Sequence, residues 1–516
     1  MNTNKNKSPK SPLIWFLYGI GTVSGIGATT LLLLFNGKNK IWFTLGASLL
    51  FFLSFKLAFF ISPPKPVIKR RPPPNVWVID SRFRIILPLI FTLFFLTALL
   101  LSFTKKSTIP IALEQQKAHA KQQIFNTKHD AQKDLPNRFK SNWTAFRGSY
   151  ATATPLHKKF PTQWDLEMGN GIKWKTEIPV DGFNAPIVWK NRVFLTGADK
   201  LGQEVFCFDA ENGELLWRKT ILTAQTLPII SEEIGLATPT MTTNGKKVFA
   251  LFASGDLVAL DLDGEIVWRK NIGRPETEEG ICSSLLCDGV RLFVQNDYKE
   301  QDKLVAFDAD TGDVLWTTPR TKISLASPAL VKIGDSLQLI LINNKSVISY
   351  EPNTGKQIWQ IQCLEGKARA SIAFDGKDTL FIANKNAKPV ALKLNKTSAK
   401  ILWTADQPLS ATASPVSTTD TLYIPTDSGK IVALDTKTGK TIWSQKGSTP
   451  FKASPLIANH TLYTFDTAGY AHLFSTTKNQ KETATIKMNE PIIATPALSH
   501  GHLFIRGRTH LFCIEK

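Results

Sequence analysis

A tryptophan that follows a glycine turn recurs through most of the chain and constrains the fold more than any other feature. The motif has the form Gly-x-x-x-Trp and occurs at Gly213–Trp217, Gly264–Trp268, Gly312–Trp316, Gly355–Trp359 and Gly439–Trp443. Trp174 and Trp403 fit the same position with weaker turns. Successive tryptophans are 43, 51, 48, 43, 44 and 40 residues apart. This is the length of one four-stranded propeller blade.

A second mark, a small residue followed by proline, precedes an apolar strand in most units. It occurs at Ala185-Pro186, Thr238-Pro239, Ser327-Pro328, Ser414-Pro415, Ser454-Pro455 and Thr495-Pro496. Ser283-Ser284 and Ala370-Ser371 hold the position without proline, which makes eight units. Each unit predicts four strands with an Asp-x-x-x-Gly turn before the last, because glycine readily adopts the positive φ of a tight hairpin.

The two ends of the repeat region predict how the ring closes. The last unit runs only from Thr495 to Lys516, too short for four strands, and residues 171–174 can supply its outer strand. Closure of this kind removes exposed sheet edges. We therefore expect an all-β, eight-bladed β-propeller over residues 143–516, in which the seventh unit, around Thr483, has no tryptophan. Large indole rings can be buried between blades, and we expect this of Trp174, Trp217, Trp268, Trp316, Trp359, Trp403 and Trp443.

Three apolar segments precede the repeats. Residues 13–35, 41–62 and 85–103 each have about the 20 residues that a membrane-spanning helix needs. We therefore expect an α-helical region with three spans over residues 13–104, after a tail of residues 1–12. Residues 105–142 are polar and predict a stalk or linker, either helical or disordered.

The distribution of charge predicts an orientation and excludes one partner class. Of the net charge of +20, residues 1–140 carry 20 Lys and Arg against 4 Asp and Glu, and the remainder 42 against 38. A nucleic-acid partner is therefore not expected. The basic residues flank the first span and fill the loop between the second and third. The positive-inside rule then places the N-terminus in the cytoplasm and the propeller outside a bacterial cytoplasmic membrane, in the periplasm or its equivalent.

The repeat resembles a known family. The block Ala306–Trp316, AFDADTGDVLW, is similar to the repeat of the pyrroloquinoline quinone (PQQ) propeller superfamily. The opening WTAFRG of Trp143–Gly148 resembles bacterial BamB-like repeat proteins. This resemblance covers about residues 143–516 and implies the quinoprotein-dehydrogenase-like propeller fold. It does not by itself imply an activity, because one fold hosts many.

The family's enzymes need a cofactor site whose residues this chain does not match. The resemblance implies that a quinoprotein dehydrogenase would have an adjacent cysteine pair, and here Cys207, Cys282, Cys287, Cys363 and Cys513 are all separated. A disulfide between Cys282 and Cys287 remains open. His500 and His502 alone do not make a zinc site. We therefore predict no catalytic residues, no metal site and no cofactor.

Length differences between units indicate where a partner could bind. The enlarged loops are residues 197–204, 222–235, 273–280 and 296–303. Antiparallel strand order places all four on one face of the first three blades, and insertions on one face of a repeat protein often mark its binding face. The candidate partner-binding residues are Leu227, Ile229, Ile230, Glu232, Glu233, Glu276, Glu278, Glu279 and Tyr298. The alternative is that these loops have no binding role.

Three functions fit these features. The first is a membrane-anchored, non-enzymatic scaffold that binds a protein of the cell envelope, as BamB-like proteins do. The second is a PQQ-dependent membrane-bound quinoprotein dehydrogenase. The third is a ligand-sensing module of the envelope.

Overall fold

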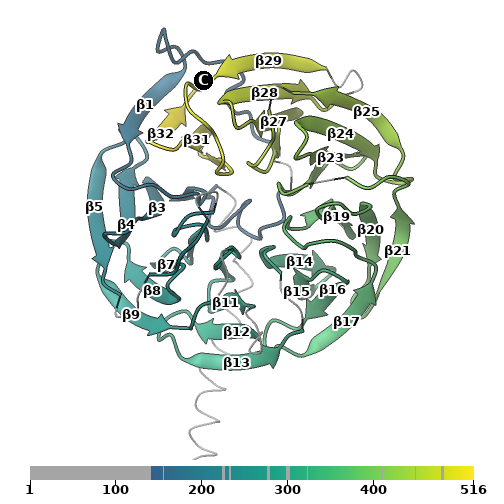
Figure 1. Ribbon diagram of the computed structural model, residues 1–516, viewed down its shortest axis with the longest axis horizontal. Coiled ribbons are helices and arrows are strands. Elements are labelled where there is room, and N and C mark those ends of the chain that lie inside the picture. The colour runs from purple at the N-terminus through teal and green to yellow at the C-terminus, as the bar shows by residue number, and fades with distance from the viewer. Residues whose placement is uncertain are drawn as a thin grey trace, which may run out of the picture. The chain divides into compact units, whose positions relative to one another are not determined.

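The computed structural model describes residues 141–516, apart from residues 155, 224–226, 232–233, 276–278, 298–302, 322–323, 410, 448 and 478–480. The described residues form 32 β-strands in eight four-stranded sheets, which are arranged around one axis as blades (Figure 1). The eight-bladed propeller is therefore confirmed. The predicted spans 13–35, 41–62 and 85–103 lie outside the described residues. Within the described part of the chain, no helix has the length and apolar character needed to cross a bilayer.

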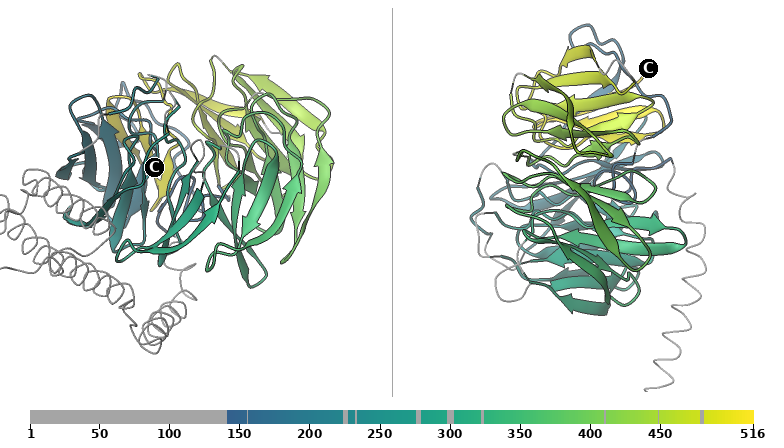
Figure 2. Two further views of the ribbon diagram at one scale, coloured as in Figure 1. Left: turned by 60° about the horizontal axis from the view of Figure 1, so that its bottom comes forward. Right: turned by 90° about the vertical axis from the view of Figure 1, so that its right-hand side faces the viewer.

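Each blade of the first half of the ring is built from four consecutive strands, ordered from the axis outward (Figures 1 and 2). Blade one holds β2 (Ile187–Trp189), β3 (Arg192–Ala198), β4 (Gln203–Asp209) and β5 (Leu215–Ile221). Blade two holds β6 (Thr242–Thr243), β7 (Lys247–Leu251), β8 (Asp256–Asp261) and β9 (Ile266–Asn271). Blade three holds β10 (Leu286–Cys287), β11 (Arg291–Asn296), β12 (Lys303–Asp308) and β13 (Val314–Pro319). Blade four holds β14 (Ala329–Ile333), β15 (Ser336–Ile342), β16 (Ser346–Tyr350) and β17 (Gln357–Gln362).

Blades five to seven repeat this order and blade eight joins the two ends of the repeat region. Blade five holds β18 (Ala373–Phe374), β19 (Thr379–Ile382), β20 (Val390–Leu394) and β21 (Ala399–Thr404). Blade six holds β22 (Val416–Ser417), β23 (Thr421–Pro425), β24 (Lys430–Asp435) and β25 (Thr441–Lys446). Blade seven holds β26 (Leu456–Ala458), β27 (Thr461–Phe465), β28 (Tyr470–Ser475) and β29 (Glu482–Lys487). Blade eight holds β30 (Ala497–Ser499), β31 (His502–Arg506), β32 (His510–Ile514) and the N-terminal β1 (Ile172–Glu177) as its outer strand, as the sequence predicts.

Tryptophans of the outer strands fasten each blade to the next. The indole N–H donates to a backbone carbonyl of the following blade, from Trp174 to Ala210 (3.0 Å), Trp217 to Leu262 (2.9 Å), Trp268 to Ala309 (3.2 Å), Trp316 to Pro352 (3.0 Å) and Trp403 to Thr436 (2.7 Å). The ring also lies on the glycine of that blade's turn. A Cβ added at Gly213, for example, would lie 2.7 Å from the ring of Trp174. The turn thus needs glycine both for its positive φ and for this close approach.

Two tryptophans reach the next blade in other ways. Trp359 donates to Oε1 of Gln338 in its own blade (2.9 Å), and Nε2 of Gln338 donates to the carbonyl of Asn395 in blade five (2.9 Å). Trp443 stacks on Phe474 of blade seven with ring centroids 5.8 Å apart. The contact between blades is therefore kept where the glycine turn is missing.

Blade seven replaces its missing tryptophan by exchanging large and small residues. In blades one to six and eight the residue paired with the tryptophan on the third strand is small, as in the pair Cys207 and Trp217. In blade seven the pair is Leu473 and Ala484, so the large residue has moved to the third strand. Trp164, from the segment before β1, joins the core cluster at this junction and donates its N–H to the sulfur of Met488 (3.3 Å).

The chain before β1 also rebuilds the turn that the split blade lacks. Oδ1 of Asp165 accepts from the amides of Glu167 (2.7 Å) and Met168 (3.0 Å). Asp209 makes the same pair of contacts in the turn of blade one, with Glu211 and Asn212. The N-terminal segment therefore supplies the eighth blade with an aspartate turn as well as an outer strand.

Hydroxyl groups near the axis form a second set of bonds between blades. Each hydroxyl accepts from the backbone N–H at the matching position of the preceding blade, at 2.9 to 3.1 Å, in the order Ala185, Thr240, Ser284, Ser327, Ser371, Ser414, Ser454 and Thr495. This hydroxyl ladder explains the small residue before proline in the repeat. In the second unit the ladder position is Thr240, two residues after the predicted Thr238, whose hydroxyl instead bonds within its own loop.

The ladder predicts unequal effects of two serine substitutions. Ser414→Ala removes the acceptor of a buried N–H, which costs about 1–3 kcal/mol of unfolding free energy. Ser398→Ala, at an exposed turn position, is the control and should change stability by less than about 0.5 kcal/mol. Urea unfolding followed by tryptophan fluorescence measures both. Equal losses in the two variants would contradict the role of the ladder.

Candidate partner-binding face

The connections between strands lie on two faces of the ring. Antiparallel order places the turns between the first and second strands, and between the third and fourth, on one face, here called the turn face. The loops between the second and third strands and the loops between blades lie on the other, the loop face. The amide of Ala253 donates to the carbonyl of Leu236 (3.1 Å), and Nδ2 of Asn296 donates to that of Ile272 (2.8 Å). Each bond joins the connection between the second and third strands of a blade to a loop between blades, so the enlarged loops share the loop face.

The structure brings two of the enlarged loops into contact. Ile230, between blades one and two, packs so closely on Gly280, between blades two and three, that a Cβ at Gly280 would lie 2.6 Å from Cδ1 of Ile230. Leu227 and Ile230 are partly buried, whereas Ile229 is 90% exposed. Five other predicted residues lie outside the described residues. They are Glu232, Glu233, Glu276 and Glu278 of these two loops and Tyr298 of the loop in blade three.

Glu279 bonds to a distant loop. Its Oε1 accepts from Nη2 of Arg369, in the loop between blades four and five, and lies 3.6 Å from Nζ of Lys367. Its backbone carbonyl accepts from the thiol of Cys282 (3.1 Å). Glu279 therefore ties two loop regions together across the loop face, and its carboxylate is already engaged within the chain.

Two exposed side chains in the enlarged loops were not among the predicted residues. Leu201 is 96% exposed in the loop between β3 and β4, and Leu222 is 76% exposed after β5. With Ile229, in the loop between blades one and two, they are three highly exposed aliphatic side chains in enlarged loops of the loop face. The sequence signal that could have found Leu201 is a leucine between polar residues in an enlarged loop. We call Leu201, Leu222 and Ile229 the aliphatic patch.

A buried polar network supports the base of these loops. Asp256 accepts from Nη2 of Arg269 (2.8 Å), the hydroxyl of Ser254 (2.7 Å) and Nε2 of Gln203 (3.3 Å). Burial alone raises the pKa of Asp256, but hydrogen bonds from Arg269, Thr223, Ser254 and Gln203 outweigh it and lower the pKa to about 2. The network joins blades one and two beneath the enlarged loop between them, so it fixes the base of that loop.

A buried ion pair fixes the base of the loops between blades three and four. Nε and Nη2 of Arg320 donate to the two carboxylate oxygens of Asp297 at 2.9 and 3.1 Å, and each side chain is 1% exposed. Asp297 also accepts from the amide of Ser324 (3.2 Å). Such bidentate pairs have a fixed geometry. They hold the loops that flank the candidate face in one arrangement.

A polar pocket lies elsewhere, between blades six and seven. It has a volume of about 350 Å³ and is lined in part by Gln445, Phe451, His472 and Glu482. Nδ1 of His472 lies 2.8 Å from Oε1 of Glu482, and Nε2 lies 3.3 Å from Oδ2 of Asp466. Gln445 and Thr485 also bond to Glu482. These side chains satisfy one another, so the pocket has the character of a structural network.

The five cysteines are free in the structure, Cys282 and Cys287 included. Burial raises the pKa of Cys207 and of Cys282 to about 12, which disfavours the reactive thiolate at neutral pH. Cys207 and Cys513 are fully buried on third strands, where the sequence predicts small side chains. Among the described residues, no group of three or more His, Cys, Asp or Glu side chains is placed to hold a metal ion.

Comparison with known proteins defines the class of this propeller. Residues 162–319 and 300–516 match the family described as outer membrane protein assembly factor BamB. The chain belongs to this family of PQQ-like β-propeller repeat proteins. A relative is the outer membrane protein assembly factor BamB of Yersinia pestis, 23% identical over 332 residues, which are 60% of this chain and 79% of the relative. The BamB of Escherichia coli is 30% identical over 132 residues, 24% of this chain and 31% of the relative.

The propeller shares its fold with solved structures of a BamB protein and of a dehydrogenase. BamB from Moraxella catarrhalis superposes with a TM-score of 0.51 at 14% identity, covering 67% of this chain and 97% of the other. A europium-containing methanol dehydrogenase superposes with a TM-score of 0.58 at 12% identity, covering 72% and 91%. At these identities the likeness establishes the fold alone.

The Asp256 network predicts a pH-dependent stability difference. Because the pKa falls from 3.8 to about 2 on folding, the carboxylate stabilises the fold above pH 3.8 and this contribution disappears as the pH falls towards 2. Asp256→Asn should therefore lower the free energy of unfolding by about 2 kcal/mol at pH 7. Below pH 3 this difference between the variant and the unmodified protein should shrink. Urea unfolding across this pH range measures it. Asp335→Asn, at an exposed turn, is the control, and a gap that does not depend on pH would contradict the explanation.

Proposed function

We propose that this protein is a membrane-anchored, extracytoplasmic scaffold of the bacterial cell envelope that binds a partner protein through the loop face of blades one to three. It acts by binding and has no catalytic role. Membership of the BamB family supports this, because the curated relatives are named as outer membrane protein assembly factors. By analogy, the partner is an envelope protein that takes part in assembly.

The aliphatic patch is the observation that carries the choice of face. Highly exposed apolar side chains on enlarged loops can be covered by a partner protein. Leu201, Leu222 and Ile229 are 96%, 76% and 90% exposed. They lie in enlarged loops whose bases are fixed by the Asp256 network. A partner would thus contact apolar side chains on loops that lose little conformational entropy on binding.

The positions of the chain ends are compatible with this arrangement. Ser141, where the described chain begins, accepts from the hydroxyl of Ser499 at the turn between the first and second strands of blade eight. The end of β32 also lies on the turn face. The described chain therefore begins at the turn face, and neither end of the propeller obstructs the loop face. We propose that the three predicted spans hold the propeller at the cytoplasmic membrane, with residues 1–12 in the cytoplasm.

Substitution of the aliphatic patch tests the proposal. Leu201→Glu with Ile229→Glu should reduce the envelope proteins recovered by crosslinking in intact cells at least tenfold, because two charges would be buried in the interface. Met168→Glu is the matched control, since Met168 is 78% exposed but belongs to the turn before β1. Thermal unfolding of each variant checks that the fold is kept. Unchanged recovery in the double variant would reject the loop face as the binding site.

A further inference from the structure

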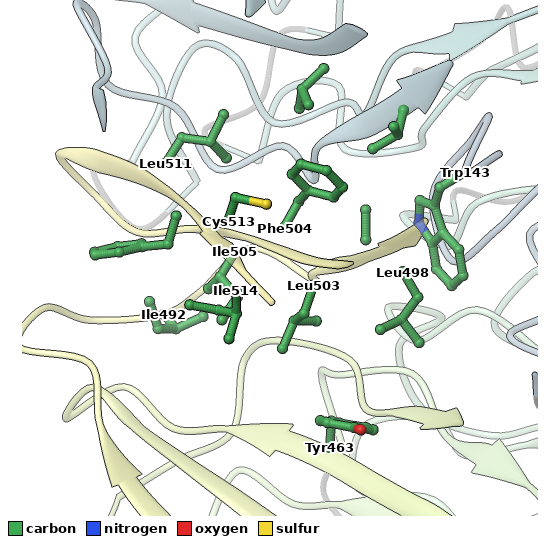
Figure 3. Close-up of a cluster of buried hydrophobic side chains, with 14 of the residues drawn as sticks. Trp143, Tyr463, Ile492, Leu498, Leu503, Phe504, Ile505, Leu511, Cys513 and Ile514 are labelled. Atoms are coloured by element: carbon green, nitrogen blue, oxygen red, sulfur yellow. The ribbon is translucent and has the colours of Figure 1, made fainter. Parts of the chain in front are cut away.

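The chain before Trp164 runs through the axis of the ring. Residues 141–156, of which 155 lies outside the described residues, are here called the axial segment. Figure 1 shows this blue segment at the centre of the blades. It bonds to blades one, two, four, five, six, seven and eight, and Ala145 and Ala151 share a core cluster with Leu286 of blade three. In Figure 3, Trp143 lies beside Leu498 of β30.

The axial segment pairs with the free inner edges of the blades. The innermost strand of each blade has no neighbour towards the axis, so its edge presents backbone donors and acceptors. Trp143 exchanges two backbone bonds with Val188 of blade one, at 2.9 and 2.7 Å. The carbonyl of Thr144 accepts from Thr243 of blade two (3.0 Å). At the other end of the segment, Leu156 donates to the carbonyl of Ile457 in blade seven (3.0 Å).

Arg147 anchors the middle of the segment. It is 1% exposed, and its Nη1 and Nη2 donate to the carbonyls of Ile372 in blade five and Pro415 in blade six. Within the described part of the chain it forms no ion pair, so backbone dipoles alone offset the cost of burying its charge. Burial lowers the pKa of Arg147 to about 9, which leaves the guanidinium charged at neutral pH.

The conformation of the segment is imposed by its surroundings. Arg147, Ala151 and Ala153 have φ values of 62°, 57° and 50°, in the left-handed region. For residues other than glycine, each such conformation costs on the order of 1 kcal/mol and persists where the surrounding structure enforces it. A free peptide of this sequence would not hold this shape. The contacts with the inner edges must therefore supply the free energy that keeps it.

We propose that the inner edges of the blades form an axial peptide-binding site, and that the axial segment is its built-in ligand, with Arg147 as the anchoring side chain. The site binds a peptide with tight turns through backbone hydrogen bonds around the axis and accepts one buried guanidinium between blades five and six. Occupation by the chain itself closes the turn-face end of the axis. Any other ligand of the axis must enter from the loop face or displace the axial segment.

Cutting the chain beside the segment tests whether the binding is non-covalent. A site for a specific protease is inserted between the exposed residues Lys158 and Lys159 of the full-length protein. After cleavage in detergent, the fragment that contains the axial segment should stay with the propeller during size-exclusion chromatography. Release of this fragment from the unmodified sequence would overturn the proposal.

Arg147→Ala in the cleavable protein should increase the rate of fragment release at least tenfold, because the two carbonyls lose their donors. Arg508→Ala is the control, since this exposed arginine pairs with Asp181 away from the axial segment. Before cleavage, thermal unfolding establishes that each variant is folded. If Arg147→Ala does not fold, Arg147→Lys takes its place. Equal retention with and without the guanidinium would show that Arg147 is not the anchor.

Discussion

The contact between an indole ring and the glycine of the next blade is the constraint on which the rest of the ring depends. It sets the spacing between neighbouring sheets, because the turn approaches the ring more closely than any side chain would allow. It requires a small residue opposite the tryptophan, such as Ala306 opposite Trp316. In the same pair of strands, a bulge lies directly before the tryptophan, since Phe307 pairs with Val314 and leaves Leu315 unpaired. One sequence motif therefore fixes the turn, the bulge and the packing between blades.

The two junctions that flank blade eight are built differently from the others. Blade seven has no outer tryptophan, and Trp164 from outside the repeat occupies the core there. Between blades eight and one the hydroxyl ladder stops at Ala185, which has no hydroxyl group. At that junction Arg506 crosses instead, and its Nη1 donates to Oδ1 of Asn184 (2.7 Å) and to the carbonyl of Thr196 (2.8 Å). The repeat is thus modified where the two ends of the repeat region meet.

Most of the propeller could be predicted because its determinants are local and repeated. The tryptophan spacing and the glycine turns predict the blades, and the short last unit predicts that β1 completes blade eight. The axial segment and Trp164 could not be found in this way, because neither belongs to a repeated unit. For the candidate site, enlarged loops indicated a face and included Ile229. Loop length could not show that Glu279 is paired with Arg369 or that Leu201 is exposed, because both depend on contacts between distant loops.

The split eighth blade has a consequence for how the protein is made. Of the 32 strands in the described residues, β1 is synthesised first and β32 last, yet Ile172 pairs with Ile514. Until β32 has left the ribosome, β1 has no partner and the ring stays open with two bare edges. Pairing between such distant segments is intrinsically slow and leaves edges open to aggregation in the meantime. Completion of the ring must therefore wait for the synthesis of β32, and until then the two unpaired edges stay open to aggregation.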